Sequence, residues 1–171
     1  SAVEERVALL EGLDANIAEK VINERITFAG GGKTLVATMK GNGAYTALVS
    51  GGFTSFTGPI SKMLGFDEHR ANILETDNGS LTGIVSKPIL GADAKVESLH
   101  DIAVAKGLTS NDFIAVGDGA NDLPMLQLAG TGVALHAKPS VAEQVDIRID
   151  NGDLTSLLYL QGYREEEFVD A

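Results

Sequence analysis

Three short segments carry the side chains that could do chemistry. Ser50-Gly51-Gly52 follows an apolar run ending at Val49, and it offers one hydroxyl and several backbone N–H groups to an anion. A second apolar run leads into Gly117-Asp118-Gly119-Ala120-Asn121-Asp122, which crowds two carboxylates and a carboxamide together. Like charges so close favour a bound cation, and Mg²⁺ suits carboxylates, water and phosphate. Lys95 lies in the first turn of a predicted helix, where the helix dipole disfavours a positive charge. A lysine at this position indicates a functional role if its side chain faces a bound phosphate.

Each segment also has a plain structural interpretation. The glycine pair can be a turn with Ser50 capping the next helix, the aspartate loop can bond its own backbone, and Lys95 can be solvated. Position favours a functional role for the aspartate loop, because open α/β sheets bind ligands outside the carboxyl ends of their strands. The three histidines lack metal-ligand spacing and are predicted to be structural; they are His69, His100 and His136.

The elements that must position these segments alternate between strands and helices. The strands are predicted at residues 44–49, 113–116, 132–135 and 146–149. The helices are predicted at residues 33–40, 93–106 and 122–128, with another ending near residue 65. The turn triplet Asp77-Asn78-Gly79 predicts a hairpin between strands 72–76 and 81–85. Residues 1–28 are predicted to form two short amphipathic helices. The alternation predicts an α/β fold with a mostly parallel sheet.

Composition narrows the class of protein. The 171 residues are enough for one domain with a real core. The formal net charge of -11 argues against nucleic acid or an anionic membrane surface as a partner, since both reward a basic face. The chain has no cysteine, which excludes disulfides, thiolate zinc sites and a cysteine nucleophile. No apolar run approaches the roughly 20 residues that a membrane-spanning helix needs, so we expect a cytoplasmic protein.

Taken together, the three segments resemble the second, third and fourth motifs of the haloacid dehalogenase superfamily. The matching motifs are Ala47-Leu48-Val49-Ser50-Gly51-Gly52-Phe53, then Lys95, then Ala115-Val116-Gly117-Asp118-Gly119-Ala120-Asn121-Asp122. Further segments are similar to the branch of the superfamily that acts on phosphoserine: Glu5-Arg6-Val7 with Leu9-Leu10, Ala71-Asn72, Leu81-Thr82-Gly83 and Ala137-Lys138-Pro139. The resemblance runs over nearly the whole chain.

The resemblance implies a Rossmann-like, three-layer core with part of a helical cap, and a small phosphate ester as substrate. Ser50 would hydrogen-bond the transferring phosphoryl oxygens, and Gly51 and Gly52 would add backbone contacts. Lys95 would neutralise phosphoryl charge and the nucleophile, while Arg6 in the cap would meet the serine carboxylate. Such groups suit phosphoryl transfer, which depends mainly on positioning and electrostatic stabilisation.

The resemblance also implies a metal site and further catalytic groups in the aspartate loop. Asp118 would bind Mg²⁺, and Asn121 and Asp122 would shape the surroundings of the phosphate and the metal. The expected catalytic residues are therefore Ser50, Lys95, Asn121 and Asp122. The expected substrate-binding residues are Arg6, Ser50, Gly51, Gly52, Lys95 and Asn121.

One family motif has no counterpart. Members begin their core with Asp-x-Asp, which supplies the nucleophile and the general acid/base, and no Asp-x-Asp occurs in these 171 residues. In the family that motif precedes the cap, so we expect a truncated chain with a partial helical cap at residues 1–28 and a core at 29–171 that lacks its first strand. Such a sheet would keep two unpaired inner edges. We expect this chain to be inactive alone, and either poorly stable or completed by a second polypeptide.

Three functions are compatible with these residues. The resemblance favours a Mg²⁺-dependent phosphatase of serine biosynthesis that converts phosphoserine to serine through an aspartyl-phosphate. A second possibility is a phosphatase of the same superfamily for another small phosphate ester, and replacement of Arg6 would discriminate the two. A third is a non-catalytic phosphate-binding remnant that keeps the fold without the nucleophile.

Overall fold

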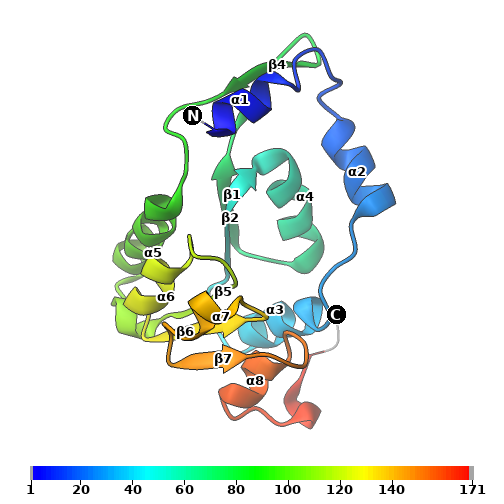
Figure 1. Ribbon diagram of the computed structural model, residues 1–171. Helices are drawn as coiled ribbons and strands as arrows, with labels where there is room; N and C mark the ends of the chain where they lie inside the picture. Colours follow the sequence, from blue (N-terminus) through cyan, green and yellow to red (C-terminus); the bar gives the residue numbers. More distant parts are fainter. Residues whose placement is uncertain (1, 170–171) are drawn as a thin grey trace. The chain divides into compact units, whose positions relative to one another are not determined.

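The computed structural model describes residues 2–169, and these residues form two compact units. Unit 1 contains the chain up to Ile89 together with the stretch from Asp153 onward, and unit 2 is the continuous segment Leu90–Gly152. Helices and parallel strands alternate in both units (Figure 1), which confirms the predicted α/β class. No helix within residues 2–169 has the length and apolar character needed to cross a membrane.

Unit 1 is built from short helices, one parallel strand pair and one hairpin. Its helices are α1 (Ala2–Ala8), α2 (Ile17–Arg25), α3 (Gly32–Gly41), α4 (Thr54–Leu64) and α8 (Ser156–Leu160), followed by a 3₁₀ turn at Glu165–Glu167. Its strands are β1 (Ala47–Phe53), β2 (Glu68–Asn72), β3 (Leu74–Asp77) and β4 (Ser80–Val85). The two short helices predicted for residues 1–28 are present as α1 and α2, while the boundary at residue 28 stays a prediction.

The parallel pair β1–β2 corrects two details of the sequence prediction. First, β1 does not end at Val49 but continues through both glycines to Phe53, because a register shift between Val49 and Phe53 accommodates the Ser50–Gly52 segment within the strand. Second, β2 was not predicted, and Asn72 ends this strand instead of opening the next one. Helix α4 packs against both strands (Figure 1).

The predicted hairpin is confirmed. Strands β3 and β4 pair antiparallel, and Asp77 lies opposite Ser80 across the turn. The two residues between them, Asn78 and Gly79, have φ values of 47° and 82°. Two successive left-handed residues give the tight turn whose twist matches a hairpin, and asparagine and glycine adopt that conformation most readily. Helix α1 packs on β4 (Figure 1).

Unit 2 is a three-stranded parallel sheet with helices in its connections. Its helices are α5 (Ala92–Lys106), α6 (Leu123–Leu128) and α7 (Pro139–Ala142), with a 3₁₀ turn at Ser110–Asp112. Its strands are β5 (Ile114–Gly117), β6 (Thr131–Leu135) and β7 (Ile147–Ile149), in the order β5-β6-β7. Leu99, Ala115, Leu126 and Ala129 form a buried cluster that ties α5 and α6 to the sheet. The cluster fixes where α5 begins relative to the end of β5.

Candidate active site

The loop that follows β5 folds around one buried carboxylate. The side chain of Asp122 accepts hydrogen bonds from the backbone N–H groups of Asp118 at 3.2 Å and Gly119 at 3.0 Å, and Asp122 is only 4% exposed. Glycine is required at position 117, because a Cβ there would lie 2.5 Å from the Asp122 side chain. The chain therefore turns back over Asp122 as soon as the strand ends.

Lys95 is the second half of this arrangement. Its Nζ donates a hydrogen bond to the Asp122 carboxylate, and the two side chains are 11% and 6% exposed. A buried ammonium costs several kcal/mol without a partner, on the order of the desolvation penalty for one ion. Lys95 also sits in the first turn of α5, where the helix dipole disfavours a cation. The pairing with Asp122 offsets both penalties and fixes the ammonium at the carboxyl end of β5.

Asp118 and Asn121 are the two remaining polar side chains of the loop, and both are exposed. Asp118 offers a hard carboxylate, and Mg²⁺ is usually held by one or two carboxylates with water and substrate phosphate completing its shell. The donor chemistry of Asp118 thus fits this ion. Among residues 2–169, no group of three or more histidine, cysteine, aspartate or glutamate side chains gathers as a metal cluster.

The other predicted anion-binding segment lies in unit 1, at the bulged end of β1. Ser50 Oγ accepts a hydrogen bond from the backbone N–H of Gly52 at 3.0 Å. Gly51 is exposed, and a Cβ built on it would meet nothing within 4 Å. Its carbonyl accepts a hydrogen bond from the side-chain amide of Asn72 at 3.0 Å.

The sequence interpretation missed Asn72 as a site residue. It appeared only within the Ala71-Asn72 resemblance, without a role, although it is 1% exposed and contacts the Ser50–Gly52 segment. The available signal was a polar residue directly after a small apolar one, and that pattern does not reveal burial. Arg6 lies on the exposed side of α1, so its role toward a substrate carboxylate stays a prediction.

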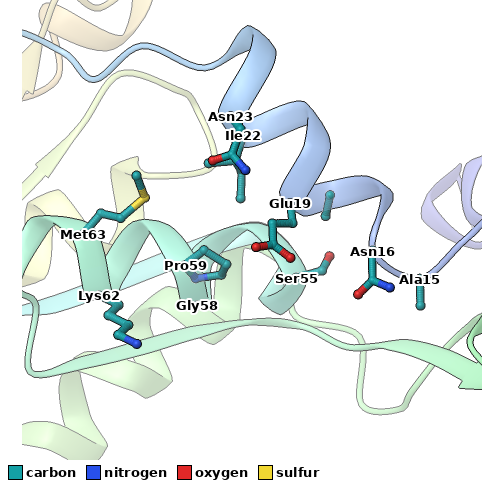
Figure 2. Close-up of a pocket in the computed structure, with 11 residues that line it drawn as sticks. Ala15, Asn16, Glu19, Ile22, Asn23, Ser55, Gly58, Pro59, Lys62 and Met63 are labelled. Carbon is teal, nitrogen blue, oxygen red and sulfur yellow. The ribbon is translucent and has the colours of Figure 1, made fainter.

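A cavity of about 550 Å³ lies elsewhere in unit 1, between α2 and α4. Figure 2 shows Glu19 reaching from α2 toward Ser55 on α4, with Lys62 on the α4 side. The hydroxyl oxygen of Ser55 is buried and has no hydrogen-bond partner within the described residues. None of the predicted site residues lines this cavity, so it is separate from the two loops.

Comparison with known proteins gives the class to which this arrangement belongs. Residues 1–127 match the family model of the haloacid dehalogenase-like hydrolases, and the chain belongs to that family. Within it, the chain is similar to phosphoserine phosphatases. It is 45% identical over 157 residues to the phosphoserine phosphatase of Streptococcus thermophilus, covering 92% of this chain and 73% of that protein. It is 43% identical over 162 residues to that of Streptomyces coelicolor, covering 95% of this chain and 39% of that protein.

Solved structures show the same similarity to phosphoserine phosphatases. A phosphoserine phosphatase crystallised as a phospho-aspartyl intermediate analogue superimposes with a TM-score of 0.83 at 40% identity, over 92% of this chain and 75% of that one. The predicted α/β fold of the haloacid dehalogenase superfamily is thereby confirmed. The chain spans well under half the length of the Streptomyces relative and 75% of this crystallised chain.

Proposed function

We propose that this chain carries most of a Mg²⁺-dependent phosphoserine phosphatase, which releases serine and phosphate and serves serine biosynthesis. The observation that carries the proposal is the buried Lys95–Asp122 pair at the end of β5. An ammonium has three donors, and Asp122 occupies one. The others are then available to oxygens of a phosphate ester and its attacking group. The similarity to phosphoserine phosphatases supports serine as the alcohol that is released.

The proposed reaction has two displacements. An aspartate carboxylate attacks phosphorus, the bond between phosphorus and the serine oxygen breaks, and a general acid protonates that oxygen. Water then hydrolyses the aspartyl-phosphate and releases inorganic phosphate. In this scheme Ser50 and the backbone N–H of Gly51 donate to phosphoryl oxygens, while the Gly52 N–H donates to Ser50 Oγ. Lys95 stabilises the charge that develops on the phosphoryl oxygens. Asn121 and Asp122 hold the loop around the phosphate.

Asp118 is the proposed magnesium ligand. A divalent cation beside the phosphate would withdraw charge from its oxygens and orient it for in-line attack. The exposed carboxylate of Asp118 supplies one ligand oxygen for it. Substitution of Asp118→Asn keeps the shape and removes the charge, so we expect a large rise in the Mg²⁺ concentration needed for activity.

The nucleophile in this scheme comes from an Asp-x-Asp segment, which these 171 residues do not contain. We therefore propose that the chain by itself does not turn over phosphoserine. Activity would appear once a strand with Asp-x-Asp is joined to it, either by fusion or as a second polypeptide. A free edge of β1 or β5 is a suitable acceptor, since each strand has only one ladder partner among the described residues.

The test compares the 171-residue chain with the same chain fused to the Asp-x-Asp segment of the Streptococcus thermophilus relative. Phosphate release from O-phosphoserine is measured with Mg²⁺ and with excess chelator. We expect turnover by the fusion with Mg²⁺ only, and loss of at least about 100-fold for Lys95→Met, because a charged donor to the phosphoryl group is removed. A correctly folded fusion without turnover would reject the function. Turnover by the unfused chain would reject the need for Asp-x-Asp.

Arg6 distinguishes phosphoserine from other small phosphate esters. In the active fusion, we expect Arg6→Ala to raise KM for phosphoserine by about tenfold or more, the scale of one lost charge-assisted hydrogen bond. Hydrolysis of phosphoethanolamine, which has no carboxylate, should barely change. Equal effects on the two esters would favour a substrate without an amino-acid carboxylate.

A further inference from the structure

Asn72 is a buried polar side chain for which the proposed reaction has no use. It is 1% exposed at the carboxyl end of β2, among the most completely buried side chains of the chain. A buried amide is costly unless it forms hydrogen bonds. Its Nδ2 group donates to the carbonyl oxygen of Gly51 at 3.0 Å, in the middle of the Ser50–Gly52 segment.

That bond fixes an entire peptide plane. The Gly51 carbonyl and the Gly52 N–H belong to one trans peptide, in which the two groups point in opposite directions. Holding the carbonyl toward Asn72 therefore aims the N–H away from it. The Gly52 N–H donates to Ser50 Oγ at 3.0 Å. The orientation that Asn72 favours for this peptide is thus one in which the Gly52 N–H donates to Ser50 Oγ.

Side-chain packing at Gly51 does not restrain this peptide. Gly51 is exposed, and nothing lies within 4 Å of the position that its Cβ would occupy. Two successive glycines also leave the backbone freer to rotate than any other pair of residues would. The hydrogen bond from Asn72 is a side-chain contact that restrains the carbonyl of Gly51.

The orientation of the Gly52 N–H affects the hydrogen bonding of the Ser50 hydroxyl. A hydroxyl has one donor and two acceptor sites. Because the Gly52 N–H occupies an acceptor site, the O–H proton of Ser50 remains available to donate to another group. A tetrahedral oxyanion, whose oxygens accept hydrogen bonds, is a ligand that suits this orientation.

We propose that Asn72 is a positioning residue: its buried amide holds the Gly51–Gly52 peptide so that Ser50 presents its hydroxyl as a donor to a tetrahedral oxyanion. The part that concerns the oxyanion rests on the proposed function. Asn72 itself does not touch the ligand in this scheme. Its effect is transmitted through Ser50, which makes the proposal testable by coupling the two residues.

The first test needs no ligand. In ¹⁵N-labelled Asn72→Asp, which keeps the side-chain shape but removes the amide donor, we expect hydrogen exchange of the Gly52 amide to accelerate about tenfold, the scale of one lost hydrogen bond. Asn42→Asp is the matched control, because the Asn42 amide donates to the Thr38 carbonyl at 2.8 Å, outside the loop. It should leave Gly52 unchanged. Unchanged exchange in Asn72→Asp would overturn the proposal.

The second test measures sulfate affinity by calorimetry in the unmodified chain and in Ser50→Ala, Asn72→Asp and the double variant. We expect about a tenfold loss for each single variant, and no further loss in the double variant, because coupled residues do not add. Losses that multiply, or an unaffected Asn72→Asp, would overturn the proposal. If the unmodified chain does not bind sulfate, the proposed phosphate site fails, while the exchange test still judges the positioning of Gly52.

A third measurement covers the case in which the charged variant does not fold. Asn72→Leu keeps a similar outline without a charge and should show the same accelerated exchange at Gly52. In the unmodified chain, a scalar coupling between the Asn72 side-chain nitrogen and the Gly51 carbonyl carbon reports the hydrogen bond directly. A folded chain without that coupling would overturn the proposal.

Discussion

The Ser50–Gly52 segment lies in the bulged part of the parallel strand β1 and the loop Gly117–Asp122 follows the parallel strand β5, and the two are held in different ways. The segment after Val49 uses neutral donors, an asparagine amide and a backbone N–H, around an exposed glycine. The loop after β5 uses a carboxylate and an ammonium that are both nearly buried. Neutral contacts of this kind are individually weak, whereas a buried ion pair is costly to break. Breaking a contact of the Ser50–Gly52 segment should therefore cost less free energy than breaking the ion pair of the Gly117–Asp122 loop.

The largest effect should come from breaking the charged loop. Asp122→Ala leaves the Lys95 ammonium buried without its partner and strips the acceptor from two backbone N–H groups. We expect a loss of about 3–5 kcal/mol in the free energy of unfolding, measured by urea denaturation. The control is Asp150→Ala in the same unit, whose ion pair with Arg148 has both side chains about half exposed, and which should cost less than about 1 kcal/mol. Equal losses would contradict the contrast.

A smaller effect should separate the glycines of the two loops. In Gly117→Ala the new Cβ would lie 2.5 Å from the Asp122 side chain, and we expect a loss of about 1–3 kcal/mol from overpacking. In Gly51→Ala the methyl group meets open space, so stability should be unchanged or raised by less than about 1 kcal/mol. Urea midpoints of the two variants measure the difference. A Gly51→Ala variant as unstable as Gly117→Ala would contradict this difference in packing between the two glycines.

The smallest effect concerns the half-buried carboxylate of Asp153, which accepts hydrogen bonds from Thr155. The Thr155 hydroxyl, and then the Thr155 backbone N–H at 2.8 Å, hold the pKa of Asp153 below its ordinary value. A lowered pKa in the folded state contributes stability above the ordinary pKa, and that contribution is lost as the pH falls through the folded value. Thr155→Val should therefore cost less than about 1 kcal/mol at pH 7, since solvent screens the interaction.

The same variant also has a pH signature. The difference between Thr155→Val and the unmodified chain should shrink as the pH falls below the ordinary range of an aspartate. Urea denaturation of both proteins at pH 7 and near pH 3 measures this difference in the free energy of unfolding. A difference that grows toward low pH would contradict the assignment of the lowered pKa to Thr155.

Local signals in the sequence were sufficient to predict much of the fold. The Asp77-Asn78-Gly79 triplet predicts the hairpin because its backbone conformation is available to few residue pairs. Strand β2 was not predicted because its sequence shows no clear alternation of apolar and polar residues. Its polar side chains form their hydrogen bonds only in the folded chain. Glu68 accepts from Arg70 at 2.6 Å and from Tyr45 at 2.8 Å, and these bonds make a polar strand stable beside β1.

The candidate site also has a part that the local sequence predicts and a part that it does not. Lys95 and the Gly117–Asp122 loop could be identified because their residue types and order carry the chemistry. That Asp122 would be the buried partner of Lys95, while Asp118 stays exposed, depends on how the loop turns back over Gly117. The role of Asn72 depends on a strand pairing between segments far apart in sequence. Neither feature has a signature in the local sequence.

The way the chain passes between its two units has a consequence for folding during synthesis. Leu90–Gly152 is continuous and holds its own buried cluster, so it can fold as soon as it leaves the ribosome. Unit 1 starts first but must wait, because Leu157 and Leu158 belong to its most buried side chains and Leu154 bonds back to the Gly30 carbonyl. The segment made first is therefore completed last, and a nascent chain that stalls before residue 153 would hold a complete Gly117–Asp122 loop while unit 1 still lacks α8.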